Sequence, residues 1–375
     1  MSDRKTLIEN AIAEIDAQAT DRQREYGAHY LHALEGDLKS KFKLMEGIST
    51  SDIPTVLAPA INVQFLAQYA AQRTVWQDIV DETIDAPSIG DSVEFGGFDF
   101  DTSSLLGDHD GDTYVGAGLP GVGEYDEYPA VKFTVEQLEA ELRKNGVRLR
   151  VSWETLAKTG NFDLIGRSTQ AFARYAAEQE DVVLAKQFIS VAGAINPRIA
   201  AVTGNPALDL EGLAAAKAQL AAATVNGRPI APSGYKLVTG AALSTQAEDI
   251  LSIRSVRRTD GSDEYDIAPR NGDVTPVNFW ALDSVGNYTT AGTTDDIWFL
   301  IATGGARPTF AEIFLEGERQ PLISVKDSGH FALSGGAVPA RQGNFTHDDV
   351  ETRGRHVVGA ALVNESGVVA SNPTR

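Results

Sequence analysis

The spacing of apolar residues changes at about residue 161. Between residues 131 and 153 apolar and polar residues alternate, which predicts two strands, and Asn145-Gly146 between them predicts a tight turn. We expect a half-buried hairpin with a basic outer face. From Asn161 to about Val191 the apolar residues recur at helical spacing, with only Gly166 to weaken the pattern. This predicts one helix of ~30 residues, ~45 Å long.

Upstream, the apolar stripes are narrow. Residues 2 to 47 predict two charged helices, the second starting at a capping box over Thr20 to Gln23. Their surfaces suit helices that lie on something else better than helices that form a core. A third helix is expected from Pro59. It should bury the apolar residues Ile61, Phe65, Leu66 and Tyr69.

Beyond Pro197 the pattern predicts a separate α+β lobe. Asp209 is expected to cap an alanine-rich helix that ends near Asn226-Gly227, and a second helix is expected around residues 246 to 256. Strands are predicted over residues 235–238, 277–282 and 297–302, and most of residues 309 to 369 is strand-like. The apolar run 356–363 suggests that the chain returns to an existing sheet.

Charge is concentrated in one stretch. The protein has 375 residues and a formal net charge of -20. Residues 85 to 131 hold eleven Asp and Glu and no Lys or Arg, so this stretch carries -11 and leaves -9 elsewhere. Its glycines and alternating aromatics favour a long two-stranded excursion over a packed domain. Such a surface repels phosphate backbones, which argues against a nucleic-acid binder.

The totals exclude several other classes. A hydrophobic content of 42% is sufficient for packed cores, and the length suits two or three lobes. The absence of Cys leaves no disulfide framework or zinc-thiolate site, as expected for a protein made in a reducing cytoplasm. The charged start lacks the apolar core of a signal peptide, and no window reaches 18 uncharged apolar residues. We expect a soluble protein that is not secreted by the usual route.

The stretch from Gly107 to Tyr128 contains two partial matches to functional loops. Asp108, Asp110 and Asp112 have the spacing of a calcium loop, but Gly111 precedes the third acid and the bidentate Glu is missing. Residues 116–121 match GxGxxG, yet Pro120 and an acid run follow where a phosphate-binding helix should open. A solvated acidic loop with flexible glycines is the better interpretation of both.

Other chemical motifs are missing. The sequence has no GxxxxGK[ST], HExxH or GxSxG. His29 and His32 share a helix face without a third ligand nearby. We therefore expect no catalytic residue, no cofactor and no metal. A carboxylate pair assembled from dispersed acids stays open as a second alternative, and it would require a deep pocket with perturbed acids.

The order of these parts resembles the major capsid proteins of tailed bacteriophages, a fold shared with encapsulins. Residues 50–54 before the Pro59 helix, with Trp76 closing that region, are similar to the start of the ordered body of phage head subunits. Residues 144–154 look like the strand that leads into the spine helix, and residues 353–360 resemble the late strand. The resemblance covers most of residues 50 to 365.

The resemblance implies an α+β fold with an N-terminal helical arm, an extended β-hairpin loop, a peripheral domain with a long spine helix, and an axial α+β domain. The implied division is 1–50 arm, 51–84 helix and lead-in to the body, 85–131 extended acidic loop, 132–196 peripheral domain, 197–307 axial domain, and 308–375 return to the peripheral domain with C-terminal strands. It implies a virion protein, made and assembled in the host cytoplasm.

The resemblance also implies partners. The chain would form hexamers and pentamers of an icosahedral head around double-stranded DNA, which it contacts weakly. Portal and scaffolding components, and a decoration protein, are further expected partners, and a membrane is not. Some family members crosslink through a Lys in the extended loop. Residues 85–131 contain none, so here that chemistry is in doubt and stability should come from non-covalent contacts.

We expect the acidic loop to dock on a basic patch of a neighbouring subunit, because complementary charge registers assembly. The inter-subunit candidates are the acids Asp108, Asp110, Asp112, Glu124, Asp126 and Glu127 and the bases Arg143, Lys144, Arg148 and Arg150, with Arg254, Arg257 and Arg258 as a second basic patch. The alternative role for these acids is to keep the outer surface soluble.

Three alternatives stay open at the level of function. An encapsulin-like compartment shares the fold, but encapsulins generally lack so large an N-terminal arm. An enzyme with an unrecognised carboxylate site is the second. A tail or decoration component is the third, and the long helix argues against it.

Overall fold

The computed structural model describes residues 65, 68–72, 74–90, 95–101, 132–138, 140–152, 154–155, 162–190, 193–225, 228–260, 263–267, 269, 271–287, 296–305, 307–326 and 345–373. The chain divides into two compact units. Unit 1 comprises Met1–Thr74, Lys144–Gln179 and Gly317–Val357, and unit 2 comprises Val75–Arg143, Glu180–Glu316 and Val358–Arg375. The two predicted N-terminal helices lie outside the described residues.

Helices and strands alternate irregularly along the chain, as expected for an α+β protein. The helices are α5 (Trp76–Ile79), α7 (Phe162–Phe188), α8 (Leu210–Ala222), α9 (Ala241–Ser252), α10 (Trp280–Asn287) and the 3₁₀ turn η3 (Glu365–Gly367). The strands are β1 (Glu82–Ala86), β2 (Phe95–Asp101), β3 (Lys132–Leu138), β4 (Leu142–Ser152), β5 (Ala200–Ala201), β6 (Thr224–Val225), β7 (Arg228–Pro229), β8 (Gly234–Thr239), β9 (Val256–Asp260), β10 (Asp263–Ile267), β11 (Val274–Asn278), β12 (Trp298–Thr303), β13 (Phe310–Leu315), β14 (Leu322–Val325), β15 (Asp349–Leu362) and β16 (Val368–Ser371).

A five-stranded sheet in the order β11-β8-β12-β16-β5 forms the centre of unit 2. Its central strand β12 is apolar from Trp298 to Ala302 because both faces are covered. Phe299 and Ile301 pack into one hydrophobic cluster, while Trp298 and Leu300 pack into the other. The strand predictions over residues 235–238 and 297–302 are confirmed by β8 and β12.

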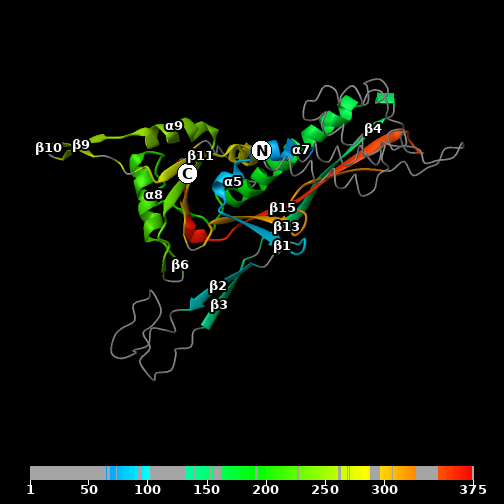
Figure 1. Ribbon diagram of the computed structural model, residues 1–375. Helices are drawn as coiled ribbons and strands as arrows, with labels where there is room; N and C mark the ends of the chain where they lie inside the picture. Colours follow the sequence, from blue (N-terminus) through cyan, green and yellow to red (C-terminus); the bar gives the residue numbers. More distant parts are fainter. Residues whose placement is uncertain are drawn as a thin grey trace, which may run out of the picture. The chain divides into compact units, whose positions relative to one another are not determined.

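Helices α8 and α9 supply residues to one of the two clusters of unit 2, and Figure 1 shows α9 near β11. Helix α8 begins where the sequence predicts, since the Asp209 carboxylate accepts a hydrogen bond from the Gly212 amide at 2.6 Å. It ends at Ala222, before the predicted limit at Asn226-Gly227. Helix α9 starts five residues earlier than the predicted helix, directly after Gly240.

The other cluster lies between the sheet, the end of α7, α10 and the strands β1, β13 and β15. Phe188 on α7 is fully buried in it, and its ring lies 4.4 Å from Phe310 and 5.0 Å from Phe299. Within unit 2, β13 pairs in parallel with β1 and antiparallel with the second half of β15. The predicted return of the C-terminal run to a sheet is confirmed by β15 and β16.

The predicted strand over residues 277–282 is wrong in its second half, because β11 ends at Asn278 and α10 begins at Trp280. Val277, Phe279 and Leu282 all belong to the same cluster. A short apolar run that crosses from a strand into a helix does not reveal the change of period.

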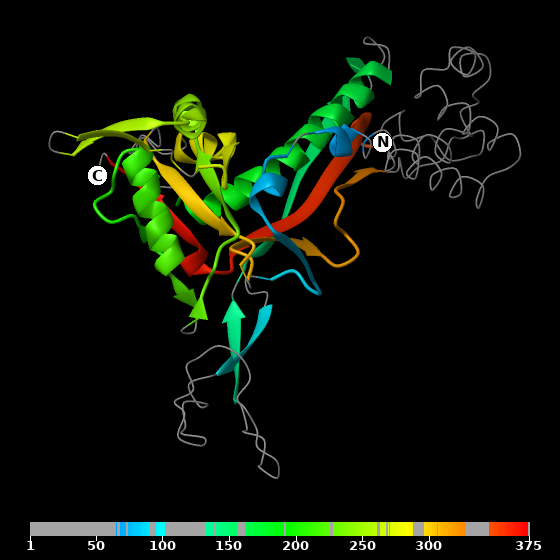
Figure 2. The same cartoon turned by 60° about the vertical axis from the view of Figure 1, so that its left-hand side comes forward.

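The hairpin predicted over residues 131–153 is also wrong. Strand β3 pairs antiparallel with β2, from Phe95 opposite Leu138 to Asp101 opposite Lys132, and Figure 2 shows these two strands side by side. The two-stranded excursion therefore exists, but its second strand lies beyond the predicted limit at residue 131. The part between β2 and β3 lies outside the described residues.

Asn145-Gly146 forms no turn, since β4 continues through it. Gly146 does not adopt a positive φ. A Cβ at this position would stand 2.6 Å from the Gly354 carbonyl oxygen, so the glycine permits a close approach to β15 instead. Val147 and Leu149 are 54% and 39% exposed, so the expected burial of this face is not found.

In unit 1, β15 pairs with β14, and the first part of α7 packs close to it. A Cβ at Gly354 would meet the Phe172 ring at 2.1 Å, so only glycine admits this helix at this distance. Phe65 is fully buried and stacks on Phe172 with ring centroids 5.4 Å apart, as expected of the helix predicted from Pro59. The prediction of one long helix is confirmed by the 27 residues of α7.

Candidate functional site

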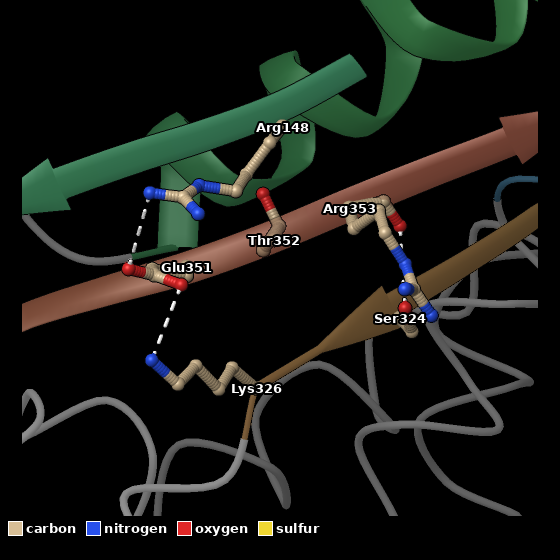
Figure 3. Close-up of a pocket in the computed structure, with 6 residues that line it drawn as sticks. All are labelled: Arg148, Ser324, Lys326, Glu351, Thr352 and Arg353. Atoms are coloured by element: carbon tan, nitrogen blue, oxygen red, sulfur yellow. Dashed lines mark hydrogen bonds and ion pairs between the residues drawn. The ribbon is translucent and has the colours of Figure 1, made fainter. Parts of the chain in front are cut away.

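Unit 1 contains a hollow of about 400 Å³ whose lining is mostly charged. We call it the charged hollow. It is lined by Arg148 from β4, by Ser324 from β14, by Lys326 directly after β14, and by Glu351, Thr352 and Arg353 from β15. Figure 3 shows Arg148 and Lys326 reaching the two sides of the Glu351 carboxylate. The hollow is therefore built around one acid.

Glu351 contacts three cations. Its carboxylate lies 3.4 Å from the Lys326 ammonium, 3.6 Å from the Arg148 guanidinium and 3.8 Å from that of Arg150. The Glu351 side chain is only 12% exposed, whereas those of Arg148 and Lys326 are 60% and 57% exposed. The cations thus keep most of their contact with solvent, and each pair contributes at most about 1 kcal/mol.

The hollow carries an excess of positive charge. Its lining has three cations, Arg148, Lys326 and Arg353, and one carboxylate, that of Glu351, and next to the lining Arg150 pairs with Asp349. Arg353 forms no ion pair with any residue that the structure describes. The Ser324 hydroxyl donates to the Arg353 backbone carbonyl at 3.4 Å. Because this contact involves the backbone, it does not compensate the charge of the Arg353 guanidinium. Two positive charges remain, and the surface suits an anionic partner.

The structure brings together half of the predicted basic patch. Arg148 and Arg150 lie on β4 and share Glu351. Arg143 contacts Glu141, and Lys144 is exposed. Neither Arg143 nor Lys144 belongs to the lining of the hollow. The six predicted acids lie outside the described residues: Asp108, Asp110, Asp112, Glu124, Asp126 and Glu127.

The second predicted patch lies at the start of the β9–β10 hairpin in unit 2. Arg254 and Arg257 are exposed, and Arg257 stands opposite Asp266 in the hairpin register. Arg258 stands opposite Tyr265. In the register of the hairpin one acidic residue, Asp266, is thus opposite this patch.

Sequence reasoning missed the three other charged members of the charged hollow, Lys326, Glu351 and Arg353. Glu351 and Arg353 are two residues apart on β15, so their side chains lie on the same face of the strand, and this spacing was visible in the sequence. Lys326 follows a four-residue strand with no such pattern, and only the pairing of β14 with β15 brings it near Glu351. No local signal could have found it.

A second hollow of about 450 Å³ lies at the turn before β14 and is lined by Gly317, Glu318, Arg319, Gln320, Pro321, Leu322 and Arg355. The Arg355 guanidinium donates to both Glu318 oxygens, at 2.7 and 2.8 Å. Leu322 is 43% exposed beside this pair. Because the charges of Arg355 and Glu318 compensate each other, this pair does not suggest a reactive group.

Unit 2 holds a buried carboxylate cluster made of Glu180, Asp181 and Glu312. All three are at most 2% exposed. Burial raises the pKa of Asp181, although the Trp76 amide, the Trp280 indole and the Val75 amide all donate to its carboxylate and oppose the rise. Burial also raises the pKa of Glu312 well above its ordinary value, and Glu180 and Asp181 add to the rise.

These three acids do not form an enzyme-like site among the described residues. None of the three lines either hollow. No group of three or more His, Cys, Asp and Glu in the described part of the chain could hold a metal ion. No described helix combines the length and the apolar character that a membrane span needs.

Solved structures similar to the chain include phage capsids and an encapsulin. A chain of Mycobacterium phage Che8 is 14% identical with a TM-score of 0.43, over 80% of this chain and 92% of that one. The capsid of Myoviridae phage XM1 is 11% identical with a TM-score of 0.45, over 77% and 88%. The holo-SrpI encapsulin complex of Synechococcus elongatus is 9% identical with a TM-score of 0.43, over 83% and 96%. At these values none of them decides between a phage head and an encapsulin.

The comparison of the sequence with protein families is more informative. No curated protein matches the chain. The family model for phage capsid proteins matches residues 134–371, well over half of the chain and all of the described strands from β4 to β16. The chain therefore belongs to the phage capsid protein family.

Proposed function

We propose that the protein is the major capsid protein of a tailed phage, which assembles into hexamers and pentamers of an icosahedral head around double-stranded DNA. The match of the phage capsid family model to residues 134–371 is the observation that carries this proposal. Members of a shell contribute through repeated interfaces, each modest and multiplied over many copies. Self-association is thus the activity to test.

On this proposal the chain acts as a structural protein and not as an enzyme. The hollows in unit 1 carry ion pairs on an exposed sheet, which suits contact with another macromolecule better than it suits a small substrate. Its location is the virion, after synthesis and assembly in the host cytoplasm.

The parts of the chain have separate roles in this proposal. Residues 1–50 form the arm and residues 51–84 the lead-in to the body. Residues 85–131 form the extended loop, 132–196 and 308–375 the peripheral domain, and 197–307 the axial domain around the symmetry axes. The long helix α7 supports a spine in the peripheral domain, and the ribbon of β2 and β3 supports an extended loop whose second strand runs past residue 131.

The net charge of the chain bears on its contact with DNA. The net charge of -20 supports only weak, salt-sensitive contact with packaged DNA. Portal and scaffolding components, and a decoration protein, are the further partners in this proposal. A gel shift with tight binding of free subunits to DNA at physiological salt would contradict the weak contact.

We propose further that the acidic loop of one subunit docks on the charged hollow of a neighbour. Residues 85–131 carry -11, and the hollow with Arg150 and Asp349 carries an excess of two positive charges. Opposite charge of this kind sets register and rate more than affinity. The competing explanation, that the acids serve solubility, predicts assembly that does not depend on the hollow.

A charge swap tests this docking. Arg148→Glu together with Arg353→Glu should slow assembly, and converting Asp108, Asp110 and Asp112 to Lys in the same chain should restore it in part. Arg254→Glu with Arg257→Glu is the matched control, since it removes the same charge from the second basic patch. Equal assembly of all variants from low to high salt would favour solubility as the role of the acids.

The encapsulin alternative is less favoured, because the matching family is that of phage capsid proteins. Native particles purified from their source separate the two. After nuclease treatment, protected double-stranded DNA is expected for a phage head. A packaged enzyme in place of DNA would overturn the proposal in favour of a compartment.

A further inference from the structure

Glu312 is a glutamate in the hydrophobic core of unit 2 without a hydrogen-bond partner. It lies at the centre of β13 and is fully buried. Neither of its carboxylate oxygens has a partner in the described part of the chain. On the same strand, Phe310 and Phe314 are two residues away on either side and belong to the core cluster. The carboxyl group is therefore surrounded by apolar packing.

The ionisable groups that act on Glu312 carry the same sign. Glu180 and Asp181, on α7, both act electrostatically on it and disfavour its charge. In the sheet register its neighbours are Thr83 on β1 and Ala360 on β15, which have no ionisable side chain. Near Thr83, Asp81 pairs with Lys236 at 2.7 Å, and Asp85 makes contacts of its own. No cation compensates Glu312 among the described residues.

The donors near α7 are already committed. The Trp76 indole N–H donates to Glu180 at 2.8 Å, and the Trp280 indole N–H donates to Asp181 at 2.9 Å. The Trp76 amide also donates to Asp181 at 2.8 Å. These bonds occupy the donors on the carboxylates of Glu180 and Asp181 and leave none of them for Glu312. Three carboxylates in one apolar site do not all ionise, and Glu312 is the one that lacks support.

We propose that Glu312 is a proton-operated latch: with its proton bound, β13 and α7 stay packed within unit 2, and loss of the proton places a buried negative charge beside the acidic side chains of Glu180 and Asp181 and loosens that contact. The direction of its pKa, well above the ordinary value, agrees with this geometry. The proposal concerns one chain and does not depend on shell assembly.

The pH dependence follows from linkage. Between the ordinary pKa of Glu312 and its raised folded value, the native state holds a proton that the unfolded chain has released. The stability of unit 2 therefore falls as the pH rises through that window, and it is fully present below it. The raised pKa of Asp181 acts in the same direction.

Glu312→Gln tests the latch in the full-length chain, because the amide keeps the shape and cannot ionise. We expect the unfolding midpoint of the wild type to fall between about pH 5 and about pH 9, and that of Glu312→Gln to fall markedly less. Glu316→Gln is the control. It replaces the same side chain at an exposed position, directly after the end of β13. Parallel pH profiles for wild type and Glu312→Gln would overturn the proposal.

A spectroscopic readout is built into the site. Trp76 and Trp280, two of the four tryptophans, donate to the two α7 acids, so their emission should change as Glu312 loses its proton. Glu312→Gln should lose this transition, and Glu316→Gln should keep it. If Glu312→Gln does not fold, infrared spectra of the wild type decide instead: the carbonyl stretch of a protonated, unpaired carboxylic acid at neutral pH supports the latch, and its absence refutes it.

Discussion

Glu351 and Glu312 are the same side chain on two strands of the fold, in opposite surroundings. Glu351, in unit 1, has three cations within 4 Å and an open hollow beside it. Glu312, in unit 2, has no hydrogen-bond partner among the residues that the structure describes, and two acids act on it electrostatically. The Glu351 carboxylate holds three cationic side chains next to one another. The Glu312 carboxyl group has a pKa well above its ordinary value because burial removes the solvent that would stabilise its charge.

This contrast separates the roles of the two regions. A surface that carries uncompensated cations can attract an anionic partner and release it with salt. A core that carries an uncompensated acid responds to protons instead. The following substitutions test the contrast by comparing the same kind of change in both units.

Phe188→Ala should give the largest loss, because Phe188 is the centre of the aromatic packing in unit 2. We expect the free energy of unfolding to fall by about 3–5 kcal/mol, measured by chemical denaturation. Phe172→Ala in unit 1 is the matched control, and it should cost less because the buried members of its cluster in the described part of the chain are Phe65, Phe172 and Ala173. Equal losses would mean that the two cores are equivalent.

Gly354→Ala should come next. The added Cβ would stand 2.1 Å from the Phe172 ring, so the ring or α7 must shift, at a cost of about 1–3 kcal/mol. Gly272→Ala is the control, since nothing lies within 4 Å of its added carbon. Combining Gly354→Ala with Phe172→Leu should recover part of the loss. A neutral Gly354→Ala would contradict the close packing of α7 against β15.

Glu351→Gln should have the smallest effect on stability. Surface ion pairs contribute little, so we expect a loss of at most about 1 kcal/mol at low salt that vanishes as salt is added. Glu365→Gln, which breaks the exposed pair with Arg198, is the control in unit 2 and should behave alike. A loss several times larger, and independent of salt, would mean that Glu351 acts as a buried charge.

Much of the fold could be predicted where the pattern was local. The period of α7, the cap at Asp209 and the apolar strand β12 were all visible in the sequence, because each depends on residues close together in the chain. The family could also be recognised from the order of such elements, and the match over residues 134–371 confirms it.

The errors arose where long-range pairing decides. Asn145-Gly146 has the composition of a turn, and only the close approach of Gly354 explains why it lies inside a strand. The partner of β3 is β2, which no local signal distinguishes from β4. The charged hollow joins residues 148, 326 and 351, which come together only through the pairing of β15 with β4 and β14.

The most direct test of the central claim is the size of the particle that the purified recombinant chain forms at moderate salt, by electron microscopy and sedimentation. Closed icosahedral shells, or hexamers and pentamers, are the predicted result. A monomer that stays inert when its head-assembly partners are added would contradict a shell subunit.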